Sequence, residues 1–543
     1  MASMGSLIRA ASGLVASQNG LYVTGHNLSN ANTTGYVRQQ SMQQESNYLT
    51  IGYQGKDILS VGLGVDVAQI RQIRDSFLDQ NYRNEIGRYG FYNAQSQTID
   101  EIEAVLGEID GESISQSIND LWDSLNELSK NPSGQETRGI FVQSAVIFIN
   151  KANHIADQLE DYQFNLNTQI KDRVKEINTL TEQIQGFNEK ISYYEASGDH
   201  ANDLRDERNL ALDRLSELID IQYHEDKTGR INITTEGHTL LSGNYVSKIK
   251  LEQTADKSPF VKPVWADTNT DVFNMNKPVG AYYQNDLGEL KGLLYARGDK
   301  KANYTDFTDS TKYQQIEGQL IPKTQAQFDY LVHTMVTMIN DQLSPKTEEG
   351  KFDTNNAPYD FKGDQSGLDL FKRVQYDRYK KEADGNLIYI KENEAQPDTL
   401  YTAGNLEVNP EILEDYDKLA LYQTKGNLSD NTLIEEMITQ WESPQLIIHP
   451  DTPSTQLSIG EYYANMIGEI GGMGQEAIQH LKNQETMVKQ VEGQRNAISS
   501  VSLDEEMSNM LKYQHAYNAS ARVVSVIDSM MDVIVNRLGV VGR

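Results

Sequence analysis

Two series of apolar residues with a spacing of seven, one at each end of the chain, constrain the fold more than any other feature. The N-terminal series is Leu7, Leu14, Leu21 and Leu28. The C-terminal series is Leu503, Met510, Tyr517, Val524, Met531 and Leu538. A strict seven-residue repeat keeps one face of a helix against a partner helix and produces a left-handed supercoil. We therefore expect the two chain ends to pair as a coiled coil, and we interpret both series as an assembly seam.

The N-terminal segment lacks the charged outer face of an ordinary surface helix. No Asp or Glu precedes Glu45, and up to residue 37 the only formal charge is on Arg9. Because a helix back that faces solvent is normally charged, we expect other protein to cover this segment in a packed assembly. The segment also contains Gly13, Gly20 and Gly25. Each glycine lowers helix stability by about 1 kcal/mol relative to Ala.

Such a helix is weak by itself, so we expect the N-terminal segment to be disordered in the monomer and to fold on assembly. A helix docked on its own domain is the alternative. The C-terminal segment carries stronger signals. Ser502 and Glu505 have the spacing of a capping box, and Asp504 and Glu506 would lie at the positive end of the helix dipole. This pattern predicts a helix that begins at about residue 503.

The residues between the two ends predict a mainly α fold with a β-rich insert, in the α+β class. Apolar residues follow helical spacing over 71–107, 139–194, 201–218, 321–343 and 460–494, with a possible break at Gly471-Gly472. Alternation predicts a short strand over 61–67 and further strands from Ile219 onwards. Residues 345–455 are rich in loops. The helices are expected to form an elongated bundle that carries an outer β-rich domain.

The order of the predicted helices, strands and loops along the chain predicts three nested domains. The predicted ranges are 1–60 plus 503–543 for a terminal coiled-coil (axial core) domain, 61–230 plus 288–344 plus 456–502 for the helical bundle, and 231–287 plus 345–455 for an outer, variable β-rich domain.

Composition excludes several classes of function. The formal net charge of −30 argues against nucleic acid or an anionic membrane surface as a partner. No segment approaches the ~20 apolar residues of a membrane-spanning helix, and the start of the chain lacks the pattern of a cleaved signal peptide. The chain has no cysteine, which fits either a cytosolic protein without need for thiols or a protein exported unfolded.

Catalytic and metal-binding patterns are also missing. The sequence has no nucleophile elbow, phosphate-binding loop or H-E-x-x-H zinc motif. His224-Glu225 lacks a second histidine one turn later. Residues 267–271 begin like a calcium loop, but Val272 replaces the required glycine. We therefore expect no catalytic residue, no metal and no cofactor, and we do not expect an enzyme.

One segment carries a resemblance to a known family. The sequence Asn27-Leu28-Ser29-Asn30-Ala31-Asn32-Thr33-Thr34-Gly35-Tyr36-Val37-Arg38-Gln39 resembles the N-terminal signature of bacterial flagellar rod, hook and hook-associated axial proteins. Its signature positions are Asn27, Asn30, Asn32, Thr33, Gly35, Tyr36 and Arg38. We expect this segment to turn the chain out of the first helix, with Gly35 in a conformation of positive φ.

Further segments resemble the hook-associated members of the family. These are residues 64–67, 74–80, 202–208, 503–507 and 513–523. Order and spacing match over about 4–250 and 456–543, with a weaker echo over 288–343. Residues 345–455 resemble nothing identifiable.

The resemblance implies a structural component of the bacterial flagellum that forms the junction layer between hook and filament by polymerising through its terminal helices. It implies a homo-oligomeric ring with the hook protein on the proximal side and a second hook-associated junction protein on the distal side. It also implies an export chaperone at the C-terminal region. The implied location is extracellular, after export by the flagellar type III pathway without a cleaved signal peptide, with no membrane insertion and no nucleic acid.

Three other interpretations stay open from the sequence. A hook or rod protein shares the N-terminal signature. A self-contained coiled-coil scaffold or adhesin would need charged helix backs, which the N-terminus lacks. A secreted enzyme carried on an axial scaffold would need a catalytic constellation within 345–455.

Overall fold

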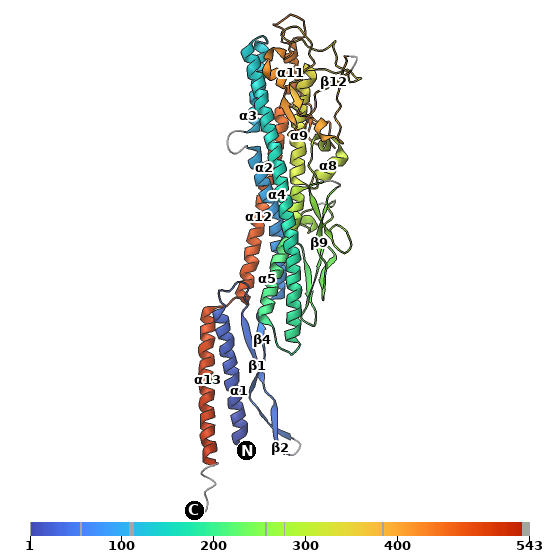
Figure 1. Ribbon diagram of the computed structural model, residues 1–543. Coiled ribbons are helices and arrows are strands. Elements are labelled where there is room, and N and C mark those ends of the chain that lie inside the picture. The colour runs from blue at the N-terminus through green and yellow to red at the C-terminus, as the bar shows by residue number, and fades with distance from the viewer. Residues whose placement is uncertain are drawn as a thin grey trace, which may run out of the picture. The chain divides into compact units, whose positions relative to one another are not determined.

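The computed structural model describes residues 2–54, 57–107, 113–255, 258–275, 277, 279–382 and 385–534 (Figure 1). The long helices are α1 (Ala2–Ser29), α2 (Ser76–Leu106), α3 (Ile114–Lys130), α4 (Gln135–Glu195), α5 (Asn202–Leu218), α9 (Leu320–Leu343), α12 (Ile459–Ser499) and α13 (Leu503–Asp532). The shorter ones are α6 (Glu289–Arg297), α7 (Tyr304–Thr308), α8 (Ser310–Ile316), α10 (Pro410–Glu414) and α11 (Thr432–Glu442), with 3-10 turns η1 (Ala281–Tyr283), η2 (Pro397–Thr399) and η3 (Tyr416–Lys418).

The strands form small antiparallel ladders. In the first part of the chain they are β1 (Gln39–Glu45), β2 (Tyr48–Gln54), β3 (Asp57–Gly62), β4 (Val65–Gln72), β5 (Gln222–Glu225), β6 (Ile231–Thr235), β7 (His238–Ser242), β8 (Tyr245–Val246), β9 (Ile249–Gln253) and β10 (Val261–Trp265). In the later part they are β11 (Phe371–Arg373), β12 (Tyr379–Lys381), β13 (Leu387–Tyr389), β14 (Leu406–Val408), β15 (Leu446–Ile447) and β16 (Gln456–Leu457). β5 to β8 make a four-stranded sheet in chain order, and the others pair two by two. The predicted fold class, mainly helical with β-rich parts, is confirmed.

Contacts divide the chain into two compact units. Unit 1 comprises Met1–Tyr89, Lys175–Lys248 and Gln484–Arg543, and unit 2 comprises Gly90–Val174 and Ile249–Asn483. The helices α2, α4 and α12 contribute residues to both units. The predicted division into three domains stays a prediction.

Unit 1 contains both ends of the chain. Figure 1 shows α1 and α13 side by side, and β1 and β4 pack against α1. Unit 1 also contains β2, β3, the start of α2, the end of α4, the helix α5, the sheet β5–β8 and the end of α12. Its core includes Ile177 and Ile184 of α4, Leu212 and Leu215 of α5 and Ile233 of β6, all of which are fully buried.

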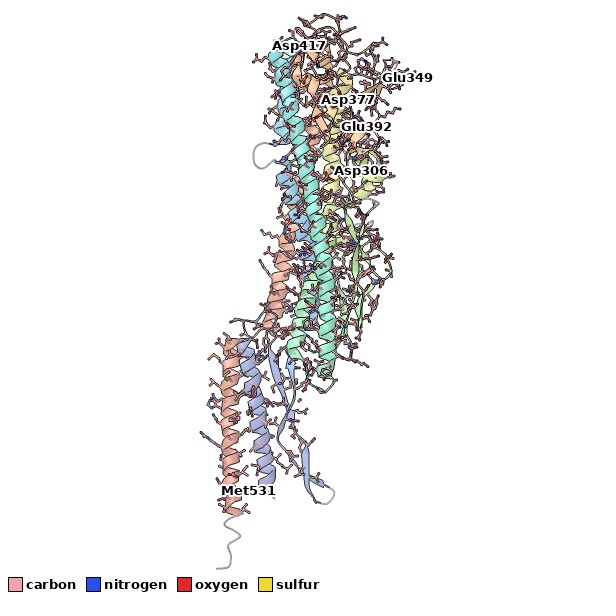
Figure 2. All side chains as sticks on the ribbon, viewed as in Figure 1. Asp306, Glu349, Asp377, Glu392, Asp417 and Met531 are labelled. Atoms are coloured by element: carbon pink, nitrogen blue, oxygen red, sulfur yellow. The ribbon has the colours of Figure 1, made fainter. Side chains whose placement is uncertain are left out.

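Unit 2 is built around a larger apolar core. Its fully buried side chains include Leu121, Leu125, Phe148, Leu331 and Ile339, from α3, α4 and α9. Residues 345–455 add short strands, short helices and loops to this unit. The acidic residues labelled in Figure 2, which are Asp306, Glu349, Asp377, Glu392 and Asp417, all belong to unit 2.

Two of the predicted elements differ in the structure. The strand predicted over 61–67 is divided between β3 and β4, because Gly64 has a φ of 115° and turns the backbone between them. The predicted helix over 71–107 begins only at Ser76, since the preceding residues complete β4. The possible break at Gly471-Gly472 is absent, and α12 continues through both glycines.

Candidate assembly site at the paired terminal helices

The terminal helices run antiparallel in a regular register. A Cβ atom built on Gly13 would lie 3.1 Å from Ser520 Oγ, and one built on Gly20 would lie 2.6 Å from the Tyr513 ring. Seven residues further along α1, Asn27 Nδ2 donates a hydrogen bond of 3.2 Å to Glu506 of α13. A move of seven residues towards the C-terminal end of α1 therefore corresponds to a move of seven residues towards the N-terminal end of α13. The predicted pairing of the chain ends is confirmed.

Small residues make the closest contact on α1. The buried residues of this helix are Ala16, Ser17, Gly20, Val23, Thr24 and Asn27. Because the Tyr513 ring occupies the space of a Cβ at Gly20, only glycine lets the two helices approach this closely. The seven-residue spacing of Gly13 and Gly20 is the sequence feature that could have predicted this contact. The prediction instead used the leucine series beside it.

The leucines of the predicted seam flank this contact. Leu7, Leu14, Leu21 and Leu28 are half-buried. Leu14 and Leu21 directly follow Gly13 and Gly20, so they point about 100° away from the line of closest approach. The structure thus brings the leucines to the edge of the helix pair. Their role in an assembly seam stays a prediction.

Most of the predicted C-terminal series faces α1. Met510, Tyr517, Val524 and Met531 are half-buried, and Figure 2 labels Met531 near the end of α13. They alternate at intervals of three and four residues with Glu506, Tyr513, Ser520 and Ile527, which completes a coiled-coil stripe. Leu503 differs, because 51% of its surface is exposed. Leu538 lies outside the described residues.

Both helices expose further apolar side chains. On α1, Ile8, Val15 and Tyr22 form an exposed row with a spacing of seven, and Tyr22 is 71% exposed. On α13 the exposed apolar residues include Leu503, Met507, Leu511, Val523, Val526 and Met530. Contiguous exposed apolar surface of this kind marks an interaction site in a soluble protein. The helix pair therefore has apolar surface left over for other contacts.

A buried carboxylate joins the signature segment to α13. Arg38 Nε donates a hydrogen bond of 2.8 Å to Glu506 Oε1, and its Nη1 lies 2.8 Å from Glu505 Oε2. The Glu506 side chain is only 3% exposed, whereas that of Glu505 is 62% exposed. A buried carboxylate is stable only with charged or hydrogen-bonding partners, and Arg38 and Asn27 supply them.

Both the nitrogen and the oxygen of the Asn27 side-chain amide form hydrogen bonds at this point. Its Nδ2 donates to the Gln39 carbonyl at 2.9 Å as well as to Glu506, and its Oδ1 accepts from the Gln39 N–H at 2.9 Å and from the Tyr36 hydroxyl at 2.8 Å. The Tyr36 hydroxyl also lies 2.9 Å from His26 Nδ1. Burial, together with the charges of Asp203, Asp206 and Glu506, raises the pKa of Tyr36 well above its usual value. We call Asn27, Tyr36, Arg38 and Glu506 the signature hub.

The remaining signature residues shape the turn. Asn30 Nδ2 donates to the His26 carbonyl at 3.1 Å, and Thr33 Oγ1 donates to Asn30 Oδ1 at 3.2 Å. Gly35 has a φ of 80°, which confirms the predicted positive φ. Asn32 is exposed. These residues end α1 and lead the chain into β1.

A second buried carboxylate, Asp206 of α5, fixes the start of β1. It accepts hydrogen bonds from the Val37 N–H at 3.1 Å and from Gln72 Nε2 at 2.6 Å. Burial raises the pKa of Asp206 to about 7, although the Val37 N–H and the Arg74 charge act in the opposite direction. Sequence reasoning missed the roles of Asp206 and Glu506, because their partners are far away in the chain.

One compact group of titratable side chains in unit 2 centres on Glu392. Tyr304 Oη donates a hydrogen bond of 2.5 Å to Glu392, His333 Nε2 lies 3.3 Å from the same carboxylate, and the Tyr401 N–H also donates to it. Burial opposes ionisation, but His333 and Tyr304 hold the pKa of Glu392 down at about 2. Internal partners therefore occupy this carboxylate, and it links the 390–401 loop to α7 and α9.

The described part of the chain lacks the features of two further classes of site. No helix there has the length and hydropathy of a membrane span. No group of three or more His, Cys, Asp or Glu side chains there is arranged to hold a metal ion.

Comparisons with known proteins match these features. The family described as "Flagellar hook-associated protein FlgK helical domain" matches residues 99–354, and "Flagellar basal body rod FlgEFG protein C-terminal" matches residues 492–538. Flagellar hook-associated protein 1 of Bacillus subtilis (strain 168) is 28% identical over 534 residues, which cover 98% of this chain and 97% of that protein. The protein of the same name from Escherichia coli (strain K12) is 24% identical over 571 residues, which cover 98% of this chain and all of the relative, 100%.

A solved structure, that of the flagellar hook junction protein FlgK from Burkholderia pseudomallei, aligns with a TM-score of 0.41 and 18% identity. The alignment covers 55% of this chain and 47% of that one.

Paired terminal helices, the signature hub and the two matched family regions define a structural protein of the bacterial flagellum, in a class without enzymatic activity. Almost the whole chain is thus similar to flagellar hook-associated protein 1.

Proposed function

We propose that this chain forms the junction layer between the flagellar hook and the filament, as a homo-oligomeric ring that polymerises through its terminal helices. The observation that carries the proposal is the apolar outer surface of the α1–α13 pair. On α1, the half-buried Leu14 and Leu21 adjoin the exposed Val15 and Tyr22, without a charged residue between them. A second copy of the chain is the expected cover for this surface.

The partners follow from the position of a junction layer. The hook protein lies on the proximal side and a second hook-associated junction protein on the distal side. The name shared by the B. subtilis and E. coli relatives, hook-associated protein 1, supports this location. We place the protein outside the cell, after export by the flagellar type III pathway without a cleaved signal peptide. The absence of cysteine supports unfolded passage through an export channel.

An export chaperone binds the C-terminal region before assembly. The exposed apolar residues of α13, among them Met507, Leu511 and Met530, support this part of the proposal. Until copies of the chain cover these side chains, they need another partner to keep the chain soluble.

Ordering of the terminal helices is coupled to assembly. The α1–α13 contact buries few large apolar side chains, since only Ala16, Val23 and Ile527 are buried apolar residues of these two helices among those described. A pair with so little buried apolar surface is marginal by itself. Neighbouring copies supply the missing contacts. Amide hydrogen exchange should show weak protection of α1 and α13 in the free chain and strong protection after assembly.

Immunogold electron microscopy of intact cells, with antibody against residues 345–455, tests the location. Gold in a narrow band where the hook meets the filament supports the junction layer. Gold along the whole hook identifies a hook-type protein, and no gold outside the cell contradicts the proposal.

Charge substitutions test the assembly surface. Leu21→Glu or Val524→Glu should block incorporation and leave the rest of the chain folded, because a carboxylate would be buried without a partner. Leu21→Met keeps the side-chain volume and should incorporate normally. Normal incorporation of both charged variants would contradict polymerisation through these helices.

A further inference from the structure

The tip of the α4–α5 hairpin carries an aromatic and acidic hollow that the terminal helices do not fill. The hollow has a volume of about 530 Å³, and its lining includes Tyr193, Tyr194, Asp199, His200 and Asp203. Tyr193 is 78% exposed and Tyr194 is 56% exposed, with ring centroids 5.6 Å apart and planes at 77°. Two neighbouring tyrosines with this much exposed ring surface are typical of contact residues in protein interfaces.

The uncompensated charge of this hollow is negative. Asp199 is exposed, and the side chain of Asp203 is 68% exposed. Arg205, which follows the lining residue Leu204, is already held by Glu195, at 2.7 Å, and by Glu225, at 2.9 Å. Tyrosine faces beside exposed carboxylates attract a basic side chain through cation–π contact and charge-assisted hydrogen bonds. Arginine suits such a site better than lysine, because its planar group can stack on a ring and pair with a carboxylate together.

Arg522 of α13 has the properties of the missing partner. It is exposed and lies two residues from both Ser520 and Val524, on the face of α13 opposite to α1. It forms no ion pair within the described residues. Arg38, Arg83 and Arg214 of unit 1 form ion pairs. Arg9 and Arg71 are also exposed without an ion pair, but they donate hydrogen bonds to the Gly5 carbonyl and to Gln40. Arg522 has neither kind of contact within the described residues.

Arg522 cannot reach the hollow of its own chain. The register of α1 and α13 places Arg522 level with residue 11 of α1, since Gly13 is opposite Ser520. The hollow is level with His26, whose Nε2 lies 3.8 Å from Asp203. Fifteen residues of helix separate the two levels, or roughly 22 Å. This is several times the length of an arginine side chain, so the two sites can meet only between copies.

We propose that the hollow formed by Tyr193, Tyr194, Asp199 and Asp203 binds the Arg522 side chain of a second copy of this chain. The inference rests on the proposed polymerisation through the terminal helices and adds a specific contact to it. It sets adjacent copies off by roughly 22 Å along the axis of α1.

Thiol crosslinking tests the contact directly, because the chain has no cysteine of its own. The double variant Asp199→Cys with Arg522→Cys is produced in cells, and isolated hook structures are treated with a short bismaleimide. A ladder of crosslinked multimers is expected, whereas each single variant stays monomeric. The matched control, Asp199→Cys with Lys512→Cys, moves the second thiol ten residues along α13 to another exposed position and should give no ladder.

Charge exchange provides a second test. Arg522→Glu and Asp199→Arg should each lower incorporation by about tenfold, and the combined variant should recover to within about threefold of the wild type. Lys512→Glu is the control and should incorporate normally. If the chain incorporates normally but gives neither a ladder nor recovery, the contact is wrong and the proposed function stands. If the wild-type chain is absent from the hook structures, the proposed function itself fails.

Discussion

The terminal helix pair and unit 2 obtain their stability in different ways. Unit 2 buries large side chains completely, including Phe141, Phe148 and Tyr313, and even the guanidinium of Arg138 is inside it. The terminal pair meets through glycine and other small residues and leaves Tyr22, Met507 and Leu511 exposed. Unit 2 buries its large apolar side chains within the chain, whereas the terminal helix pair leaves apolar surface exposed. We infer that unit 2 stays folded by itself, whereas the terminal helix pair completes its packing in the proposed assembly.

Unit 2 and the terminal helix pair also differ in charge. The excess of acidic residues falls mainly in unit 2, and like charge of this kind opposes close approach of copies there. The helix α1 carries almost no charge, so its close approach to other copies in the proposed assembly would meet little repulsion.

The largest expected effect concerns the buried arginine of unit 2. Arg138 donates to the carbonyl oxygens of Pro132 at 2.9 Å, Tyr416 at 2.7 Å and Leu419 at 3.2 Å. Arg138→Ala should lower the free energy of unfolding by about 4 kcal/mol, because it leaves these acceptors unpaired and opens a cavity. Differential scanning calorimetry of the full chain measures the loss. The exposed neighbour Gln143→Ala should change it by less than about 0.5 kcal/mol.

The second prediction compares two partners of one arginine in the signature hub. Arg38 contacts both the buried Glu506 and the exposed Glu505. Glu506→Gln should reduce incorporation in competition with a tagged wild-type chain by about 30-fold, since a buried charged hydrogen bond contributes about 2 kcal/mol. Glu505→Gln should reduce it less than about fivefold, as expected for an exposed ion pair. Equal losses would show that the hub does not depend on burial.

The third prediction concerns pH. The pKa of Asp206 is about 7 in the folded chain, above the ordinary value of 3.8. The folded state therefore holds a proton that the unfolded state has lost, and stability falls as the pH rises from about 4 to about 7. Asp206→Asn should remove this dependence, which is on the order of 4 kcal/mol. Thermal unfolding of both proteins across this range measures it, and parallel curves would exclude Asp206 as the source.

The smallest effect separates two glycines of α1. Gly20→Ala would place a methyl group against the Tyr513 ring, so a loss of about 1 kcal/mol in helix pairing is expected. Nothing lies within 4 Å of a Cβ at Gly25, so Gly25→Ala should stabilise the helix by about 1 kcal/mol. In competition with a tagged wild-type chain, Gly20→Ala should lower incorporation and Gly25→Ala should raise it. Equal effects would mean that close helix approach does not limit assembly.

The sequence predicted those parts of the fold that local periodicity determines. Helices were expected over 139–194 and 321–343, and α4 and α9 follow these ranges within a few residues. The capping signal at Ser502 is likewise confirmed, since its side chain accepts a hydrogen bond from the Glu505 N–H. The predicted strand over 61–67 failed, because one positive φ at Gly64 outweighs an alternating pattern.

The site was harder to predict, because long-range contacts define it. Arg38 and Glu506 are 468 residues apart in the chain, and no local pattern connects them. The leucine series drew attention away from the glycine row beside it, since large apolar residues are usually the ones that pack. The signature could be found by its resemblance to a family, but its hydrogen bonds could not.

The hydrogen bond from the Arg38 N–H to the Ser499 carbonyl, 2.9 Å long, has a consequence for how the terminal helices find each other. Bringing Gly13 to Ser520 closes a loop of about 500 residues, with an entropy loss of roughly 5 kcal/mol for a flexible chain. Once the intervening residues are folded, residues 38 and 499 are already adjacent, and each helix starts a few residues away. The two ends of the polypeptide then meet like the arms of a short helical hairpin, at roughly 3 kcal/mol less.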